Sequence, residues 1–197
     1  MAGPGDPQAT DAAPWTAGRI AFDGPRARGA RYNPEVTKGP VRLDVSVGYA
    51  VPRAGLPASV SFRKWVAAAL ASRIREADLA IRIVGTAEGR ALNRHYRGKD
   101  HATNVLSFPA EMAEGVKLPK GVKLPLLGDI VLCAPVIARE AKQQGKPLAW
   151  HYAHLTVHGV LHLLGWDHQD EREAECMEVL EREILSGLGI GDPYALN

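Results

Sequence analysis

The chain of 197 residues is 46% hydrophobic and 6% aromatic, a composition ordinary for one globular domain with an apolar core. The longest nearly apolar stretch, residues 130–138, is about half the length needed to cross a bilayer, so no membrane span is expected. The formal net charge of +2 is unevenly distributed, because the segment from Gly165 onward holds 9 acidic and 2 basic residues and leaves 22 basic and 13 acidic residues before it.

The first 40 residues are rich in Ala, Gly, Pro and Arg and show no periodicity. Such a segment buries too little apolar area to offset its ordering entropy, so residues 1–40 are expected to be a disordered N-terminal extension and residues 41–197 a single domain. The start of the chain lacks the basic patch and apolar run of a secretory signal, which predicts a cytoplasmic location. Cys133 and Cys176 form no C-x-x-C pair and are expected to be reduced, partly buried thiols.

Residues 41–49 alternate apolar and polar positions, as a half-buried strand does. Ser59 can cap a helix that extends to about Arg75, and a second short strand is predicted at 79–84. The inner side of this helix is expected to hold Trp65, Val66, Ala69 and Leu70. A strand, a helix and a strand in this order favour one right-handed parallel crossover.

The middle of the chain predicts a helix at 86–96, a strand at 104–108 stopped by Pro109, and a lysine-bearing loop at 111–125. A fourth strand is expected at 128–133.

Two further helices are predicted at 135–144 and 148–164, each followed by a glycine. Asp170 and Glu173 form a capping box for a last, acidic helix. The inner face of that helix is expected to be Ala174, Met177, Leu180 and Ile184. Together these elements predict a small α/β (α+β) domain with a four-stranded mixed sheet and about five helices.

The most informative segment contains His158, His162 and His168, with Gly165 between the last two. Histidines four residues apart stack on one face of a helix, so His158 and His162 can converge on one ion. Gly165 can adopt the left-handed conformation that ends a helix and turns His168 back toward the same point. Three imidazoles leave a fourth position open, which is typical of a catalytic zinc, and the sequence therefore predicts one Zn²⁺ on a helix like that of metalloproteases.

His151 and His154 lie on the same helical stripe. His154 and His162 are roughly 12 Å apart along a helix, so the pair of ligands is either His154 with His158 or His158 with His162. Only the second pair is followed by a glycine turn and a third histidine. His154 is then a candidate for orienting a ligand or facing substrate, although simple packing is the commoner role. Asp167 can orient a ligand or cap the following turn.

The spacing H-x-x-x-H-x-x-G-x-x-H is shared with metzincin peptidases, which have a glutamate directly after the first histidine as general base. This chain has Gly159 at that position, and no other carboxylate of the motif takes its place. Peptide hydrolysis is therefore disfavoured.

Four sequence blocks, at residues 96–100, 103–109, 127–131 and 158–168, resemble the YbeY family of metal-dependent endoribonucleases. The resemblance extends from about Leu43 to Tyr194. It implies a mixed sheet with helices packed on it, one zinc ion held by His158, His162 and His168, and a role of Arg97 in RNA cleavage. Asn104 stands where the family often has aspartate, so no carboxylate role is carried over to that position.

The activity that this resemblance implies is zinc-dependent, single-strand-specific endoribonuclease cleavage in ribosomal RNA processing, namely maturation of the small-subunit rRNA 3′ end and ribosome quality control. Single-stranded and ribosomal RNA are the implied partners, together with ribosomal or ribosome-associated proteins. A guanidinium at Arg97 can hold a phosphate oxygen, and the basic body of the chain would guide the strand. Without the resemblance, a cluster of Arg90, Arg94, Arg97 and Lys99 would be read as a solvated surface.

Two other functions stay open at this point. One is a ribosome assembly factor without catalytic activity, in which the zinc is structural. The other is a metzincin-like hydrolase that acts on peptides or small molecules.

Overall fold

A computed structural model describes residues 42–71, 73–110, 126–166 and 171–195 of the chain. The strands are β1 (Arg42–Tyr49), β2 (Glu76–Val84), β3 (Val105–Pro109) and β4 (Leu126–Cys133), and the helices are α1 (Ser59–Leu70), α2 (Thr86–Arg97), α3 (Ala134–Gln143), α4 (Leu148–Leu163) and α5 (Glu171–Gly187). The disordered extension predicted at 1–40 and the loop predicted at 111–125 lie outside the described residues.

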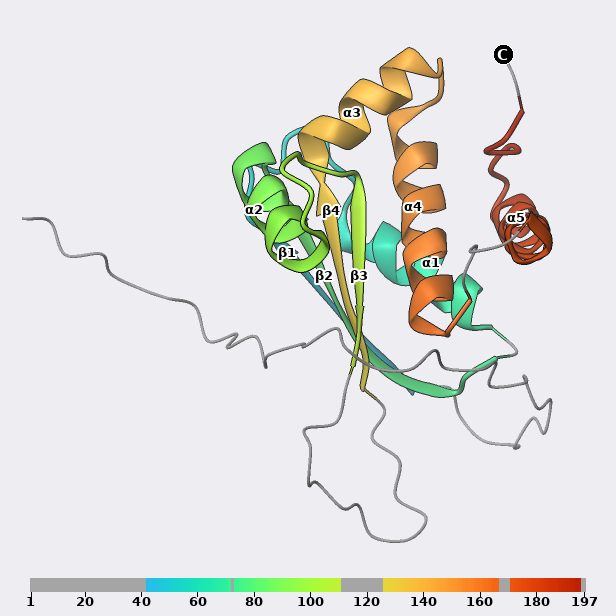
Figure 1. The fold of residues 1–197 in the computed structure, drawn as a ribbon. Coiled ribbons are helices and arrows are strands. Elements are labelled where there is room, and N and C mark those ends of the chain that lie inside the picture. The colour runs from blue at the N-terminus through green and yellow to red at the C-terminus, as the bar shows by residue number, and fades with distance from the viewer. Residues whose placement is uncertain (1–41, 72, 111–125, 167–170, 196–197) are drawn as a thin grey trace, which may run out of the picture.

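The described strands form one sheet in the order β1-β2-β4-β3 (Figure 1). β1, β2 and β4 run parallel, and β3 pairs antiparallel with β4 at one edge. Helix α1 connects β1 to β2, so the predicted parallel crossover is present. The predicted α/β fold with a mixed four-stranded sheet and about five helices is therefore confirmed.

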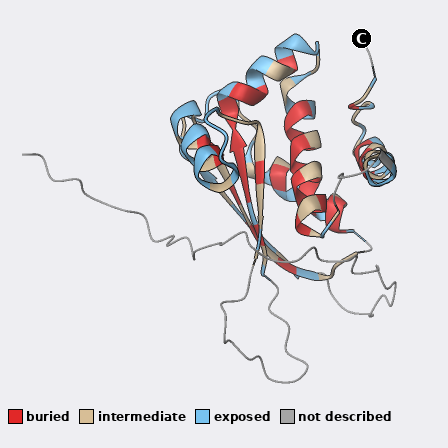
Figure 2. Cartoon of the chain, in the orientation of Figure 1, coloured by how far each residue is buried: buried red, intermediate tan, exposed pale blue. Residues whose placement is uncertain are grey.

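Helices cover both faces of the sheet. Alternate residues of β4 belong to different apolar clusters, because Ile130 and Leu132 pack with α1, α4 and α5, whereas Val131 and Cys133 pack with Leu92 of α2. Figure 2 shows the buried residues gathered along the sheet and the inner sides of the helices. Helices α2 and α4 thus lie on opposite faces of the same sheet (Figure 1).

Gly128 allows the end of β3 to approach β4 closely. Its φ of +140° is rarely adopted by residues with a side chain, and a Cβ there would lie 2.2 Å from the carbonyl oxygen of Phe108. The same Cβ would lie 3.0 Å from Cδ2 of Leu163, in the last turn of α4. The Gly128 end of β4, which pairs with Pro109 of β3, therefore lies close to the C-terminal end of α4.

The first helix is shorter than the sequence predicts. It ends at Leu70 rather than near Arg75, because β2 begins at Glu76 and pairs with the whole of β1, so residues 71–75 are needed for the connection. Ser59 is inside the helix, Ala58 occupies the N-cap position, and no side chain caps this end. The predicted inner residues are buried, as expected: Trp65, Val66, Ala69 and Leu70.

The last helix confirms part of its predicted inner face, since Met177 and Ile184 are buried. Asp170 of the predicted capping box lies outside the described residues. Both cysteines are free, but Cys176 is exposed rather than partly buried, because it lies off the buried stripe of α5. Among the described residues, no helix is long and apolar enough to span a membrane.

Candidate metal centre

Helix α4 carries a row of histidines, two of which contact α5. His154, His158 and His162 recur at every fourth residue, and each is half-buried. The rest of the helix is largely buried against the sheet and α1, so the backbone that carries the three rings is held by the core.

The side chains of His158 and His162 face one another. Their Nε2 atoms are 3.1 Å apart and their ring centroids 4.5 Å apart. Two nitrogens bound to one zinc at about 2.0–2.1 Å in tetrahedral geometry lie roughly 3.3 Å from each other. The pair therefore fits a shared ion, and the structure brings together two of the three predicted ligands.

The third predicted ligand, His168, and the adjacent Asp167 lie outside the described residues. The turn before them is described. Gly165 has a φ of +86°, in the left-handed region, and its backbone N–H donates to the carbonyl oxygen of His162 at 2.9 Å. The predicted glycine turn at the end of α4 is therefore present.

A carboxylate from α5, which the sequence reasoning missed, organises the histidine row. The side chain of Glu181 is fully buried, and its Oε1 lies 2.8 Å from Nδ1 of His158. Its Oε2 lies 3.2 Å from Nε2 of His154 and also accepts a hydrogen bond from the hydroxyl of Tyr194. His154 thus contacts the carboxylate that holds His158. The sequence did hold a signal for this buried carboxylate, because Glu181 stands four positions after Met177, on the apolar stripe of α5.

The charge on Glu181 selects the tautomer of His158. Burial raises the pKa of this carboxyl, but hydrogen bonds from His154 and His158, the charge of His154 and the Tyr194 hydroxyl outweigh it and lower the pKa to about 2. An ionised carboxylate can only accept, so His158 donates from Nδ1. The lone pair of the neutral imidazole is then on Nε2, the atom that faces His162.

A second set of side chains could also hold a metal ion. Ligand atoms of His154, His158 and Glu181 all lie within 4.8 Å of one another. This set would use His158 through Nδ1, whereas the pair with His162 uses Nε2. The two arrangements are therefore alternatives at His158. The set with Glu181 requires this carboxylate to exchange its existing hydrogen bonds for metal bonds. The pair of His158 and His162 leaves those hydrogen bonds in place.

His151 belongs to a different polar network. It is buried, and its Nε2 lies 2.9 Å from Oε2 of Glu140 on α3. The side chain of Asn104 donates to the same oxygen at 3.0 Å, and its own Oδ1 accepts from the backbone N–H of Val105 at 2.7 Å. Burial lowers the pKa of His151 and keeps its ring neutral. Asn104 and His151 therefore link the start of β3 to α3 and α4 through Glu140. Neither is hydrogen-bonded to the histidine pair in the contacts described.

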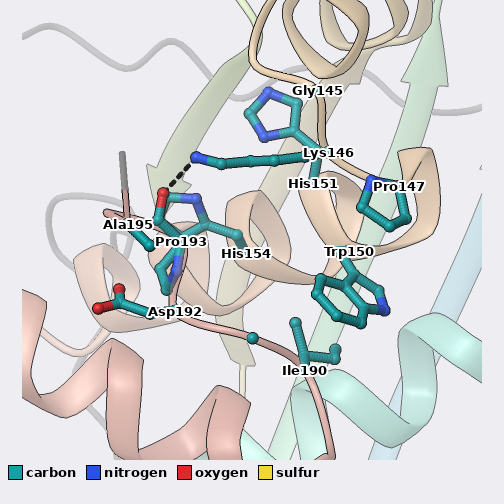
Figure 3. Close-up of a pocket in the computed structure, with 11 residues that line it drawn as sticks. Gly145, Lys146, Pro147, Trp150, His151, His154, Ile190, Asp192, Pro193 and Ala195 are labelled. Atoms are coloured by element: carbon teal, nitrogen blue, oxygen red, sulfur yellow. Dashed lines mark hydrogen bonds between the residues drawn. The ribbon is translucent and has the colours of Figure 1, made fainter. Parts of the chain in front are cut away.

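A cavity of about 150 Å³ lies beside the histidine row (Figure 3). Its lining includes Lys146, Trp150, His151 and His154, and the segment from Ile190 to Ala195 closes its other side. His158 and His162 do not line it. The cavity is therefore separate from the point between the Nε2 atoms of His158 and His162. His154 lines the cavity and is linked to His158 through Glu181.

Packing explains why α4 has no glutamate after His158. A Cβ on Gly159 would lie 3.0 Å from Cδ1 of Ile130 and 3.1 Å from Oγ of Ser107, which is tighter than ordinary contact. Helix α4 thus lies close to the sheet at this point, and a side chain there would have to displace Ile130 or Ser107. The glutamate of the metzincin arrangement would meet this crowding.

Arg97 and the histidines belong to helices on opposite faces of the sheet. Arg97 is exposed in the last turn of α2, on the face of the sheet opposite α4. Tyr96, its neighbour, packs against Phe108 with ring centroids 4.8 Å apart, which places this turn of α2 near the Pro109 end of β3. Arg97 and the histidine pair therefore lie near the same end of β3, on opposite faces of the sheet.

Comparison with known proteins finds the family that the sequence resembles. A family model described as Endoribonuclease YbeY matches residues 58–189. Proteins named Endoribonuclease YbeY from Stenotrophomonas maltophilia (strain R551-3) and Xanthomonas axonopodis pv. citri (strain 306) are each 76% identical over 160 residues, which is 81% of this chain and 98% of theirs. The protein of that name from Xanthomonas oryzae pv. oryzae (strain MAFF 311018) is 74% identical over the same length.

Among solved structures, the solution structure of a Thermotoga maritima protein aligns with 77% of this chain and 99% of its own length. The TM-score is 0.49 and the sequence identity is 20%.

Proposed function

The chain belongs to the YbeY family of endoribonucleases, and from this premise we propose that it cleaves single-stranded RNA with the help of a bound Zn²⁺. The proposed role is ribosomal RNA processing, at the 3′ end of the small-subunit rRNA and in ribosome quality control. We place the activity in residues 41–197 as a single domain and in the cytoplasm. Ribosomal RNA is the proposed substrate, and ribosomal or ribosome-associated proteins are the proposed partners.

One observation carries the proposal: the 3.1 Å approach of the Nε2 atoms of His158 and His162. Together with His168 they would hold a single zinc ion through three neutral imidazoles. When bound, the zinc would polarise a phosphate oxygen and lower the pKa of a water molecule beside the scissile bond.

The chain's own residues prepare this site before any ion arrives. Glu181 holds the proton of His158 on Nδ1, so that Nε2 presents its lone pair toward His162. Tyr194 and His154 donate to the same carboxylate and keep its oxygens in place. The burial of Glu181 excludes water, which would otherwise compete for these hydrogen bonds.

Arg97 is the proposed phosphate ligand. Its guanidinium stays charged at any working pH and can hold a phosphate oxygen through two hydrogen bonds, which stabilises the charge that develops during cleavage. Its exposure in the last turn of α2 leaves it accessible to a polyanion.

The test combines metal analysis of the purified full-length protein with cleavage of a labelled single-stranded RNA, in the presence and absence of chelator. We expect about one equivalent of zinc and cleavage that chelation abolishes. Arg97→Ala should lose cleavage and keep its zinc, whereas His162→Ala should lose both. RNA cleavage that persists in the chelated protein or in Arg97→Ala would refute the assigned roles.

A further inference from the structure

The last turn of α2 and the residues after it present three exposed cations. Arg94, Arg97 and Lys99 are exposed, and their side chains make no hydrogen bond or ion pair with another described residue. The neighbouring carboxylate is already neutralised, because Asp100 accepts two hydrogen bonds from Arg90 at 2.8 and 2.6 Å. The charge of the three cations is therefore available to a ligand.

Aromatic rings lie next to these cations. His95 packs against Tyr96 with ring centroids 4.6 Å apart, and Tyr96 packs against Phe108 of β3 at 4.8 Å. Arg94 and His95 also line an open hollow of about 540 Å³ on the outer side of α2. Cations interspersed with aromatic rings are typical of surfaces that bind single-stranded nucleic acid, where phosphates meet the charges and bases stack on the rings.

The cations of α2 and the histidine pair of α4 lie near the same end of β3, the end at Pro109. Tyr96 contacts Phe108 on one face of the sheet, and on the other face Leu163 of α4 approaches Gly128, which pairs with Pro109. Figure 1 shows β3 between the lower parts of α2 and α4. Among the described residues, β3 has no strand on its outer side.

The flank of α4 that carries the histidines also faces this edge. The opposite flank of the helix, with Ala153, Val157 and Val160, is buried in the cluster that includes α1. Because successive residues are 100° apart around a helix, His158 and His162 lie on the side away from α1. Helix α1 contacts β1, at the other edge of the sheet, so the histidine side is that of β3.

We infer that single-stranded RNA lies across the last turn of α2 on Arg94, Arg97 and Lys99, and passes over the outer edge of β3 near Phe108 to reach His158 and His162. This inference rests on the proposed function and adds the path of the substrate to it. A single strand can bend over such an edge and offer its bases to His95 and Tyr96. The stiff, stacked bases of a duplex cannot do so.

The test is the double variant Arg94→Ala/Lys99→Ala, with Arg97 unchanged because it is assigned to cleavage. The matched control is Lys64→Ala/Arg139→Ala, which removes one Lys and one Arg that are also exposed but lie on α1 and α3. Both pairs are made in a His162→Ala background for binding, measured by fluorescence anisotropy of a labelled single-stranded RNA over a series of salt concentrations. The same pairs in the unaltered background are assayed for RNA cleavage below KM.

The expected magnitude follows from counterion release. Each lost phosphate contact with a single strand reduces the slope of log K against log salt by about 0.7, so the α2 pair should reduce it by about 1.4. At 0.1 M salt this corresponds to roughly 25-fold weaker binding, and cleavage below KM should fall by a similar factor. The control pair should change the slope little, because its cations lie off the path.

Two outcomes overturn the inference. If the unaltered protein cleaves RNA but the α2 pair binds and cleaves like the control pair, the path is wrong and the proposed function stands. If the unaltered protein does not cleave RNA and the His162→Ala protein does not bind it, both are wrong. A selective loss of RNA binding in the α2 pair supports the path, even if cleavage by the unaltered protein is not found.

Discussion

Replacing Glu181 with glutamine tests the organisation of the histidine row most directly. The substitution keeps the shape of the side chain but replaces one acceptor oxygen with an NH₂ donor. In the native protein His158 donates to one carboxylate oxygen, and His154 and Tyr194 donate to the other. Whichever way the amide is turned, its NH₂ group faces a side chain that is oriented to donate.

Two effects of the Glu181→Gln change can be estimated. A buried donor left without an acceptor costs about 1–3 kcal/mol, so the free energy of unfolding should fall by that amount. If the amide NH₂ faces His158, the proton is no longer held on Nδ1 and Nε2 is no longer reserved as the metal ligand. Loss of a group that orients a metal-binding histidine typically weakens metal affinity by about 10–100-fold.

The assays are urea unfolding of the metal-free protein and competition for zinc against a chelator of known affinity. The control is Glu178→Gln, also on α5, because Glu178 is half-exposed and forms an ion pair with Arg182 at 2.9 Å on the surface. Exposed pairs of this kind contribute about 0.5 kcal/mol or less. If Glu181→Gln and Glu178→Gln have equal stability and equal zinc affinity, the assigned role of the buried carboxylate is refuted.

Three further predictions concern single side chains of α4. His162→Ala should lose bound zinc while His154→Ala keeps most of it, as measured by metal analysis, and the reverse result would favour the ligand set with Glu181. Gly159→Glu should lower the free energy of unfolding by about 3 kcal/mol or more, because its side chain would overpack Ile130 and bury a charge; an unchanged urea midpoint would contradict this. Burial lowers the pKa of His151 below 6.5, so the unfolded chain binds more protons, and stability should fall as the pH drops below 6.5. His151→Gln should flatten that acid-side decline in a series of unfolding curves, and a decline of equal slope would count against it.

Local sequence patterns predicted the residues that a short stretch of chain can bring together. His158 and His162 are a helical turn apart, so the helix alone places their rings side by side. Gly165 ends the same helix through its own left-handed conformation, which no distant residue has to impose. The alternation of apolar residues likewise predicted the first strand, and the order strand, helix, strand predicted the parallel crossover.

Contacts between distant segments were not predictable in the same way. Glu181 is 23 residues from His158, and its role depends on how α5 packs against α4. The position of Arg97 on the opposite face of the sheet from α4 depends on how α2 packs against β4, which no local pattern reveals. The end of α1 at Leu70 was missed because the pairing of β2 with β1 overrides the helical tendency of the residues after it.

The hydrogen bond from Tyr194 to Glu181 has a practical consequence for preparing the protein. Tyr194 is three residues from the end of the 197-residue sequence, and the adjacent Pro193 accepts a hydrogen bond from Lys146 at the start of the histidine helix. An expression clone that stops before Tyr194 would remove this support of His158 without touching a histidine.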